Sequence, residues 1–123
     1  ANWEKTEAYD KMEAMLQANP DIEGVICGND TMLEGVCAAL QAAGKKLPVI
    51  GVDGSDEAAA LIKSGDATGT ALQQFAVIAE MAVEQADQYL KEGSTGVDEK
   101  QLVDCIAITS ENVDKLAGFV YTE

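Results

Sequence analysis

The chain has 123 residues, 47% of them apolar, with 22 acidic and 8 basic side chains and a formal net charge of -14. This length and apolar content fit one globular domain with a buried core, and the negative charge disfavours nucleic acid and anionic lipid surfaces as partners. All basic residues are lysines, so the arginine fork for phosphates and carboxylates and the histidine of many catalytic and metal sites are absent. Uncharged ligands are favoured, and no apolar run is long enough to predict a membrane span.

Helices and strands are predicted to alternate along the chain. Asp30 and Ser55 precede amphipathic segments and are expected to cap those helices. Because crossovers between parallel strands place helices against the sheet, the alternation predicts an α/β fold, a three-layer parallel sheet with helices on both faces. The predicted elements are, in chain order, a helix over 5–19, a strand over 25–27, a helix over 30–44, a strand over 48–52, a helix over 55–65, a strand over 68–72, a helix over about 76–91, a strand over 102–108 and a last helical turn that ends near 119.

Three polar residues stand where predicted strands end: Asn29, Asp53 and Gln73. The carboxyl ends of parallel strands meet along one edge of an α/β sheet, where ligands bind, so these side chains are predicted to line a ligand site. A local role stays open for each of them. Asp53 could hydrogen-bond the turn at Gly54, Asn29 could be a turn residue before the next helix, and Gln73 could be an exposed loop amide.

The three cysteines, Cys27, Cys37 and Cys105, are widely spaced, and each lies in an apolar run. They are predicted to be buried thiols that act as small hydrophobic side chains, and a single disulfide stays open as an alternative. Three thiols without histidine or close spacing do not form the usual tetrahedral ligand set, so no metal site is predicted.

The motifs of common enzyme classes are absent. No G-x-G-x-x-G follows a predicted strand and no G-x-x-x-x-G-K-[ST] occurs, so nucleotide phosphates lack a backbone cradle. No serine stands in a G-x-S-x-G turn, and no histidine is present to serve one. Neither catalysis nor a cofactor is therefore expected.

Four segments resemble the periplasmic sugar-binding proteins of the ribose, galactose and xylose group. They are NPDIEGVICGNDTM from Asn19 to Met32, VIGVDG from Val49 to Gly54, TALQQ from Thr70 to Gln74 and ITSENV from Ile108 to Val113. The NDTM and GVDG elements are weak when taken alone, but together and at this spacing they are specific. The resemblance covers nearly the whole chain, in order.

The resemblance implies roles for individual residues. Asn29 matches an asparagine that hydrogen-bonds sugar hydroxyls, Asp53 a carboxylate that accepts hydrogen bonds from them, and Gln73 an amide near a hinge crossing. Trp3 stands where the family often places an aromatic ring against the sugar. The chemistry agrees, because amides and a carboxylate pair with the hydroxyls of a polyol while an indole covers its C–H face. For Trp3, a frayed end or a cover for the core stays open.

The resemblance further implies that residues 1–123 are the C-terminal lobe of a two-lobed, type I periplasmic binding protein. Such a protein delivers a neutral sugar or polyol to the membrane permease of an ABC importer, in the periplasm or, on a lipid anchor, outside a Gram-positive cell. The helix over about 76–91 would normally pack on the N-terminal lobe. Without that lobe, the chain is expected to self-associate through this helix and its cleft face.

Two other classes of protein share parts of this pattern. A phosphoacceptor receiver domain also keeps an aspartate at a strand end, but it needs an acid pair and a late lysine, whereas Asp30 stands alone and Thr109 and Ser110 follow the last predicted strand. The effector-binding core of a lactose-repressor-type regulator has a similar fold and would bring a basic helix-turn-helix, which this sequence does not contain. A solute-binding role is the favoured prediction, and the regulator core stays open as the alternative.

Overall fold

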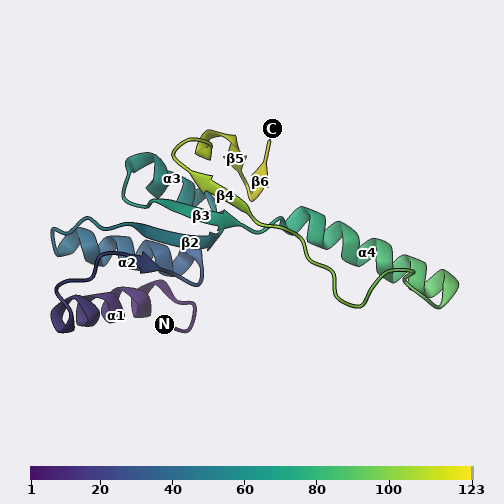
Figure 1. The fold of residues 1–123 in the computed structure, drawn as a ribbon, viewed down its shortest axis with the longest axis horizontal. Helices are drawn as coiled ribbons and strands as arrows, with labels where there is room; N and C mark the ends of the chain where they lie inside the picture. The colour runs from purple at the N-terminus through teal and green to yellow at the C-terminus, as the bar shows by residue number, and fades with distance from the viewer. Residues whose placement is uncertain (123) are drawn as a thin grey trace.

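The computed structural model describes residues 1–122. A sheet with helices beside it forms the main body, and one long helix extends away from it (Figure 1). The helices are α1 (Lys5–Ala18), α2 (Asp30–Ala42), α3 (Asp56–Ser64) and α4 (Phe75–Glu92), with one 3₁₀ turn, η1 (Val113–Lys115). The strands are β1 (Val25–Ile26), β2 (Val49–Asp53), β3 (Gly69–Leu72), β4 (Ile106–Thr109), β5 (Leu116–Ala117) and β6 (Val120–Tyr121).

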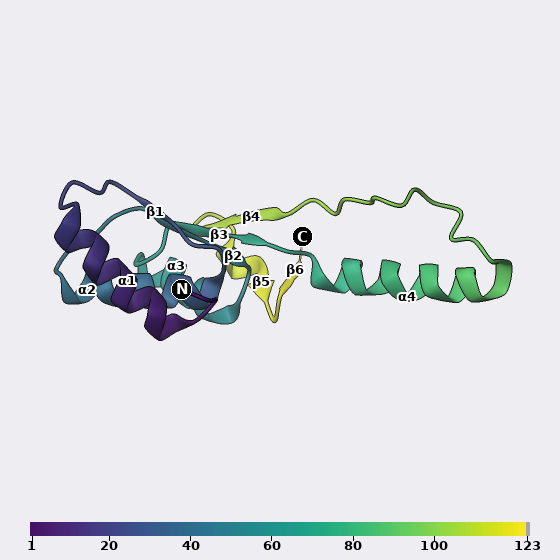
Figure 2. The same cartoon turned by 90° about the horizontal axis from the view of Figure 1, so that it is seen from below.

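Four strands form the main sheet in the order β1-β2-β3-β4. β1, β2 and β3 are parallel, with Ile26 opposite Ile50 and Asp53 opposite Leu72. β4 is antiparallel to β3 and pairs Ile106 with Leu72. The α/β class and the first three parallel strands are confirmed, but the expectation of a wholly parallel sheet is wrong for β4. The reason is that α4 leads away from the end of β3 and the chain returns to that same end (Figure 2).

Helices α1, α2 and α3 lie on the same face of the sheet (Figure 2). Parallel strands joined by right-handed crossovers that all step in one direction place their helices on one side, which explains this arrangement. The hydrophobic core lies between these helices and the sheet. Its largest fully buried side chains are Met12, Leu33, Val49, Leu72 and Ile108.

The opposite face of the sheet carries apolar residues that are open to solvent. Ile26 is 83% exposed, and Ile50 and Ala107 are exposed as well. Successive side chains of a strand point to opposite faces, so these residues alternate with buried neighbours such as Val49 and Ile108. Within residues 1–122, α1, α2 and α3 cover one face of the sheet, and the predicted third layer is not observed in that part of the chain.

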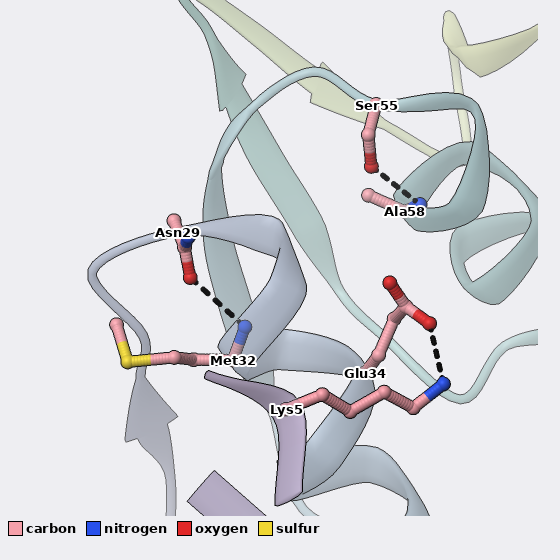
Figure 3. Close-up of polar contacts among 6 residues, drawn as sticks. All are labelled: Lys5, Asn29, Met32, Glu34, Ser55 and Ala58. Atoms are coloured by element: carbon pink, nitrogen blue, oxygen red, sulfur yellow. Dashed lines mark hydrogen bonds and ion pairs between the residues drawn. The ribbon is translucent and has the colours of Figure 1, made fainter. Parts of the chain in front are cut away.

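Two helices begin with a side-chain cap. Oδ1 of Asn29 accepts a hydrogen bond from the amide of Met32 at 2.9 Å, and Oγ of Ser55 accepts one from the amide of Ala58 at 3.0 Å (Figure 3). The predicted cap at Ser55 is confirmed. The predicted cap at Asp30 is wrong, because Asn29 holds the cap position and Asp30 is the first helical residue, with its side chain buried.

Helix α4 forms an arm that is almost separate from the rest of the fold (Figure 1). None of its 18 residues is buried, and Val83 is 70% exposed. Residues 93–105 run back beside it, where Gln85 and Gln101 exchange side-chain hydrogen bonds at 2.9 and 3.0 Å. Among residues 1–122, no helix combines the length and apolar character needed to cross a bilayer.

The last strand of the sheet is shorter than predicted. It begins at Ile106 instead of 102, because the preceding residues belong to the exposed return from α4. Cys105 is therefore exposed, and its predicted burial is wrong. Cys27 and Cys37 are buried as predicted, and the thiols of all three cysteines are free.

After β4 the chain forms a small hairpin. The predicted helical turn is observed only as η1, and β5 and β6 pair antiparallel beyond it, so the expected helical end near Phe119 is wrong. The hairpin docks on the start of α3, where Oδ1 of Asp56 accepts a hydrogen bond from the amide of Gly118 at 2.8 Å. Phe119 contacts Phe75 edge to face, with ring centroids 5.7 Å apart.

Candidate functional site

The candidate site lies at the edge of the sheet where β1, β2 and β3 end. Asp53 is the last residue of β2, Gln73 directly follows β3, and Asn29 stands three residues beyond the last residue of β1. Because Ile26 pairs with Ile50, the register brings Asn29, three residues past Ile26, to the level of Asp53, three residues past Ile50. The predicted placement of these residues along one edge is observed, and their contact with a ligand stays a prediction.

Asn29 presents a hydrogen-bond donor at this edge. Its Oδ1 atom is engaged by the amide of Met32, so the Nδ2 group is the part of the side chain left for a partner (Figure 3). The neighbouring N-terminus of α2 carries partial positive charge from the helix dipole. This position therefore favours an oxygen that accepts a hydrogen bond.

Asp53 and Gln73 are in direct contact. Nε2 of Gln73 donates a hydrogen bond to Oδ1 of Asp53 at 2.7 Å, and the amide of Gln73 donates to the carbonyl of Asp53 at 3.2 Å. The φ angle of Asp53 is 123°, which is rare for a residue with a side chain and costs about 1–3 kcal/mol. Such strain persists only where the surroundings enforce it, which marks Asp53 as a functional candidate. Oδ2 of Asp53 and Oε1 of Gln73 are the remaining acceptors.

The Trp3 indole lies against the strand end at Gly28. A Cβ atom built on Gly28 would lie 2.8 Å from Cζ3 of Trp3 and 3.0 Å from Cε of Met32, so a larger residue there would require the ring to shift. Trp3 is 64% exposed, which leaves most of the ring open to a ligand. The ion pair of Lys5 with Glu34 at 2.6 Å joins the start of α1 to α2 just after this tryptophan (Figure 3). The structure thus places Trp3 beside the residue that precedes Asn29.

Asp30 is a site neighbour whose position the sequence did not reveal. Its side chain is 2% exposed, and its carboxylate accepts hydrogen bonds from the amides of Gly54 and Ser55 at 2.8 Å each and from Oγ1 of Thr70 at 2.7 Å. Burial raises the pKa of Asp30, although these hydrogen bonds act to lower it. The only sequence signal was an acid beside Asn29 at the end of a strand.

A shallow groove of about 510 Å³ adjoins Asp53. Its other walls come from the start of α4 and from the C-terminal hairpin. The residues that line it are Asp53, Phe75, Ala76, Gly118, Phe119 and Val120. One carboxylate in a mostly apolar groove suits a small molecule that has both hydroxyls and C–H surface.

The side chains at this edge offer hydrogen-bonding groups and one aromatic ring. Among residues 1–122, no group of three or more histidine, cysteine, aspartate or glutamate side chains is placed to hold a metal ion. Asn29 offers a donor, Asp53 and Gln73 offer acceptors, and Trp3 offers an apolar ring. A hydroxyl both donates and accepts hydrogen bonds, so a polyol satisfies all of these groups at once.

The fold is an α/β sheet with candidate ligand groups along the ends of its parallel strands. The chain belongs to the family of periplasmic binding protein domains, whose model matches residues 1–95. The resemblance predicted from the strand-end motifs is thereby confirmed.

Several relatives of the chain are named for sugars or polyols. A D-apiose import binding protein of Paraburkholderia graminis is 52% identical over 97% of this chain, and a xylitol-binding protein of Mycolicibacterium smegmatis is 36% identical over 100% of it. A solved periplasmic solute-binding protein from Actinobacillus succinogenes with bound D-allose matches with a TM-score of 0.86 and 28% identity over 93% of this chain. The chain spans 38%, 35% and 41% of the lengths of these three proteins.

Proposed function

We propose that this chain is the C-terminal lobe of a solute-binding protein that captures a neutral sugar or polyol for an ABC-type importer. The sugar binds at the strand ends, between this lobe and an N-terminal lobe, and leaves chemically unchanged. A branched or simple pentose of the D-apiose type is the favoured ligand. The site of action is extracytoplasmic, and the permease of the importer is the membrane partner.

The observation that carries this proposal is the contact between Asp53 and Gln73 at the strand ends, in line with Asn29. An amide, a carboxylate and a second amide along one edge match the alternating donors and acceptors of a sugar rim. The indole of Trp3 supplies the apolar surface that packs on sugar C–H groups. Together these groups form half of a pocket, and a second lobe closing over them would remove the sugar from water.

The choice of a pentose rests on the relatives. Two D-apiose import binding proteins, from Paraburkholderia graminis and Actinobacillus succinogenes, are each 52% identical to the chain over 97% of its length. Other relatives are named for xylitol, ribose and D-allose at lower identity. A small neutral carbohydrate is common to all of them.

The exposed arm supports the two-lobed arrangement. The match to the solved D-allose-bound protein covers 93% of this chain and so includes most of the 18 residues of α4. An amphipathic helix with no buried residue needs a cover for its apolar side. In our proposal that cover is the N-terminal lobe, and the isolated chain self-associates in its absence.

The receiver-domain alternative finds little support at this edge. Its chemistry requires carboxylates that are free to hold a divalent ion near the phosphoacceptor. Both oxygens of Asp30 are engaged by the chain itself, and Oδ1 of Asp53 is engaged by Gln73. Acetyl phosphate with magnesium should therefore leave the protein unmodified.

The proposal is tested by calorimetric titration of D-apiose, D-ribose and xylitol into a protein that joins this lobe to its N-terminal partner. Asp53→Ala should weaken the best of these ligands by about 1.5–3 kcal/mol, the scale of a hydrogen bond to a charged group. Recovered sugar should be unaltered, since no catalytic step is proposed.

Asp66→Ala is the matched control for this titration. Asp66 is also an exposed carboxylate that accepts a side-chain hydrogen bond, from Oγ of Ser64 at 2.6 Å, but it follows α3 and is not at the strand ends. Its removal should leave the affinity unchanged. Equal affinity of wild type and Asp53→Ala would exclude Asp53 from the site, and no binding of any of the three ligands would refute the proposed ligand class.

A further inference from the structure

The buried carboxylate of Asp30 links three separate parts of the candidate site. Asp30 begins α2, its Oδ2 atom accepts from two successive amides of the loop after β2, and its Oδ1 atom accepts from Thr70 in β3. Its partners lie 24, 25 and 40 residues away along the chain. One side chain therefore joins the start of α2, the loop after β2 and strand β3.

The fold reserves space for this carboxylate. A Cβ atom on Gly51, in the middle of β2, would overlap Oδ1 of Asp30 and lie 3.0 Å from Cδ2 of Leu33. Any larger residue at position 51 would push the carboxylate out of its place. Within residues 1–122, no buried side-chain nitrogen or oxygen lacks a hydrogen-bond partner, so the arrangement around Asp30 is also fully paired.

The two amides that Asp30 holds come directly after Asp53. Gly54 and Ser55 follow the residue whose φ angle is 123°, and a strained backbone angle is maintained only when the residues on both sides are fixed. On the other side, Gln73 binds the carbonyl and the carboxylate of Asp53. Asp30 is thus the anchor on the C-terminal side of Asp53.

We propose that Asp30 is a positioning residue of the site: without touching the ligand, it fixes Asp53 in the orientation in which that carboxylate, together with Gln73, meets a sugar hydroxyl. This inference rests on the proposed function for the identity of the ligand. The orientation of Asp53 can be measured without a ligand, so the positioning role of Asp30 and the proposed function are tested separately.

The first measurement uses the backbone amide resonances of the 123-residue chain without ligand. Asp30→Ala removes the acceptor, so the resonances of Gly54, Ser55 and Asp53 should shift and their amide exchange should accelerate. Asp30→Asn should restore a nearly native pattern. Its Oδ1 atom can accept from both amides while Nδ2 donates to Oγ1 of Thr70, because a hydroxyl both donates and accepts.

The second measurement is sugar affinity in the two-lobed protein. Asp30→Ala should weaken D-apiose binding by about tenfold or more, the scale of losing hydrogen bonds to a charged group, and Asp30→Asn should stay within about threefold of wild type. Leu16→Ala, which destabilises the far end of α1, controls for stability alone. It should lower the melting temperature but keep the affinity and the Asp53 resonance.

The results separate positioning from the proposed function. Unchanged Asp53 resonances in Asp30→Ala, or changes no larger than those in Leu16→Ala, would overturn the positioning role. If wild type binds no sugar, the proposed function fails while the resonances still decide the role of Asp30. If Asp30→Ala does not fold, Gly51→Ala replaces it, since its Cβ displaces the carboxylate, and native Asp53 resonances in that variant would overturn the inference.

Discussion

Helices α2 and α4 carry similar amphipathic patterns but have opposite surroundings. Seven of the 13 residues of α2 are buried, whereas none of the 18 residues of α4 is buried. The apolar stripe of each helix predicts that one of its sides packs against another segment. Only for α2 does the described chain supply that cover, so an amphipathic pattern predicts a buried face without saying which segment buries it.

The starts of the two helices differ in the same way. α2 begins with the side-chain cap of Asn29 and the buried carboxylate of Asp30, whereas Gln74, which precedes α4, provides no side-chain cap. The candidate ligand groups Asn29, Asp53 and Gln73 lie at the ends of the sheet strands and not on α4. The site is therefore held by the well-buried part of the fold, and the arm contributes the wall at Phe75.

The contrast in burial predicts a large difference in stability between paired variants. Leu33→Ala removes a side chain that is 0% exposed and should lower the free energy of unfolding by about 2–5 kcal/mol. At a dilution that keeps the chain monomeric, Val83→Ala in the arm should change it by less than about 0.5 kcal/mol. Urea denaturation followed by circular dichroism measures both. A large loss for Val83→Ala in the monomer would contradict the exposure of the arm, whereas a loss that appears only at higher protein concentration would indicate self-association through it.

The two buried cysteines and the exposed one should differ in thiol reactivity. Burial raises the pKa of Cys27 and of Cys37 to about 11, from an ordinary value of 9.0, so each thiol supplies about a hundredfold less thiolate at pH 8 than an ordinary cysteine. Cys105 is exposed beside the arm and should react first with a disulfide reagent. Mass spectrometry of the labelled chain, with Cys105→Ser as the control, identifies the order. Rapid labelling of Cys37 in the folded chain would contradict its burial.

The two helix starts are compared by removing one side chain from each. Asn29→Ala removes the cap of α2 and should cost about 1 kcal/mol of unfolding free energy, within the usual range of 0.5–2. Gln74→Ala before α4 should cost less, because Gln74 makes no cap hydrogen bond there and its side-chain bond to the carbonyl of Asp104 is exposed to solvent. Thermal unfolding of both variants measures the difference. Equal losses would show that the cap hydrogen bond of Asn29 contributes little.

The smallest expected effect is a pH dependence of the stability that arises from Asp30 at the start of α2. Burial raises the pKa of Asp30 in the folded state, so the folded chain holds this proton more tightly than the unfolded chain. Stability relative to Asp30→Asn should therefore be greatest below about pH 3.8, the unfolded value, and fall as the pH rises through the folded pKa. Urea titrations of both proteins at several pH values measure this difference. A difference that grows with pH would contradict the raised pKa.

Much of the structure at the strand ends could be predicted, because the sequence patterns that indicate it are local. Apolar runs that end in Asn29, Asp53 and Gln73 are visible in the sequence, and the rule for parallel strands then places all three at one edge. The role of Asp30 could not be predicted in this way. Its partners Gly54 and Thr70 are distant in the sequence, and no local pattern shows which buried acid meets which loop.

Two of the errors lie next to the arm. The direction of β4 depends on where α4 leads the chain, and the local sequence of a strand does not encode its direction. Cys105 lies in an apolar run, yet the run begins in the exposed return segment and enters the sheet only at Ile106. The pattern identified the apolar run correctly but did not show that its first residue, Cys105, lies outside the sheet.

The antiparallel pairing of β4 with β3 has a mechanical consequence for the arm. Leu72 pairs with Ile106, and Nε2 of Gln74 donates to the carbonyl of Asp104 at 2.7 Å, so the outgoing and incoming chains pass side by side. Two adjacent passages attach the arm to the sheet at one place. A rotation there would carry the far tip of α4 through a wider arc than the strand ends that carry Asp53.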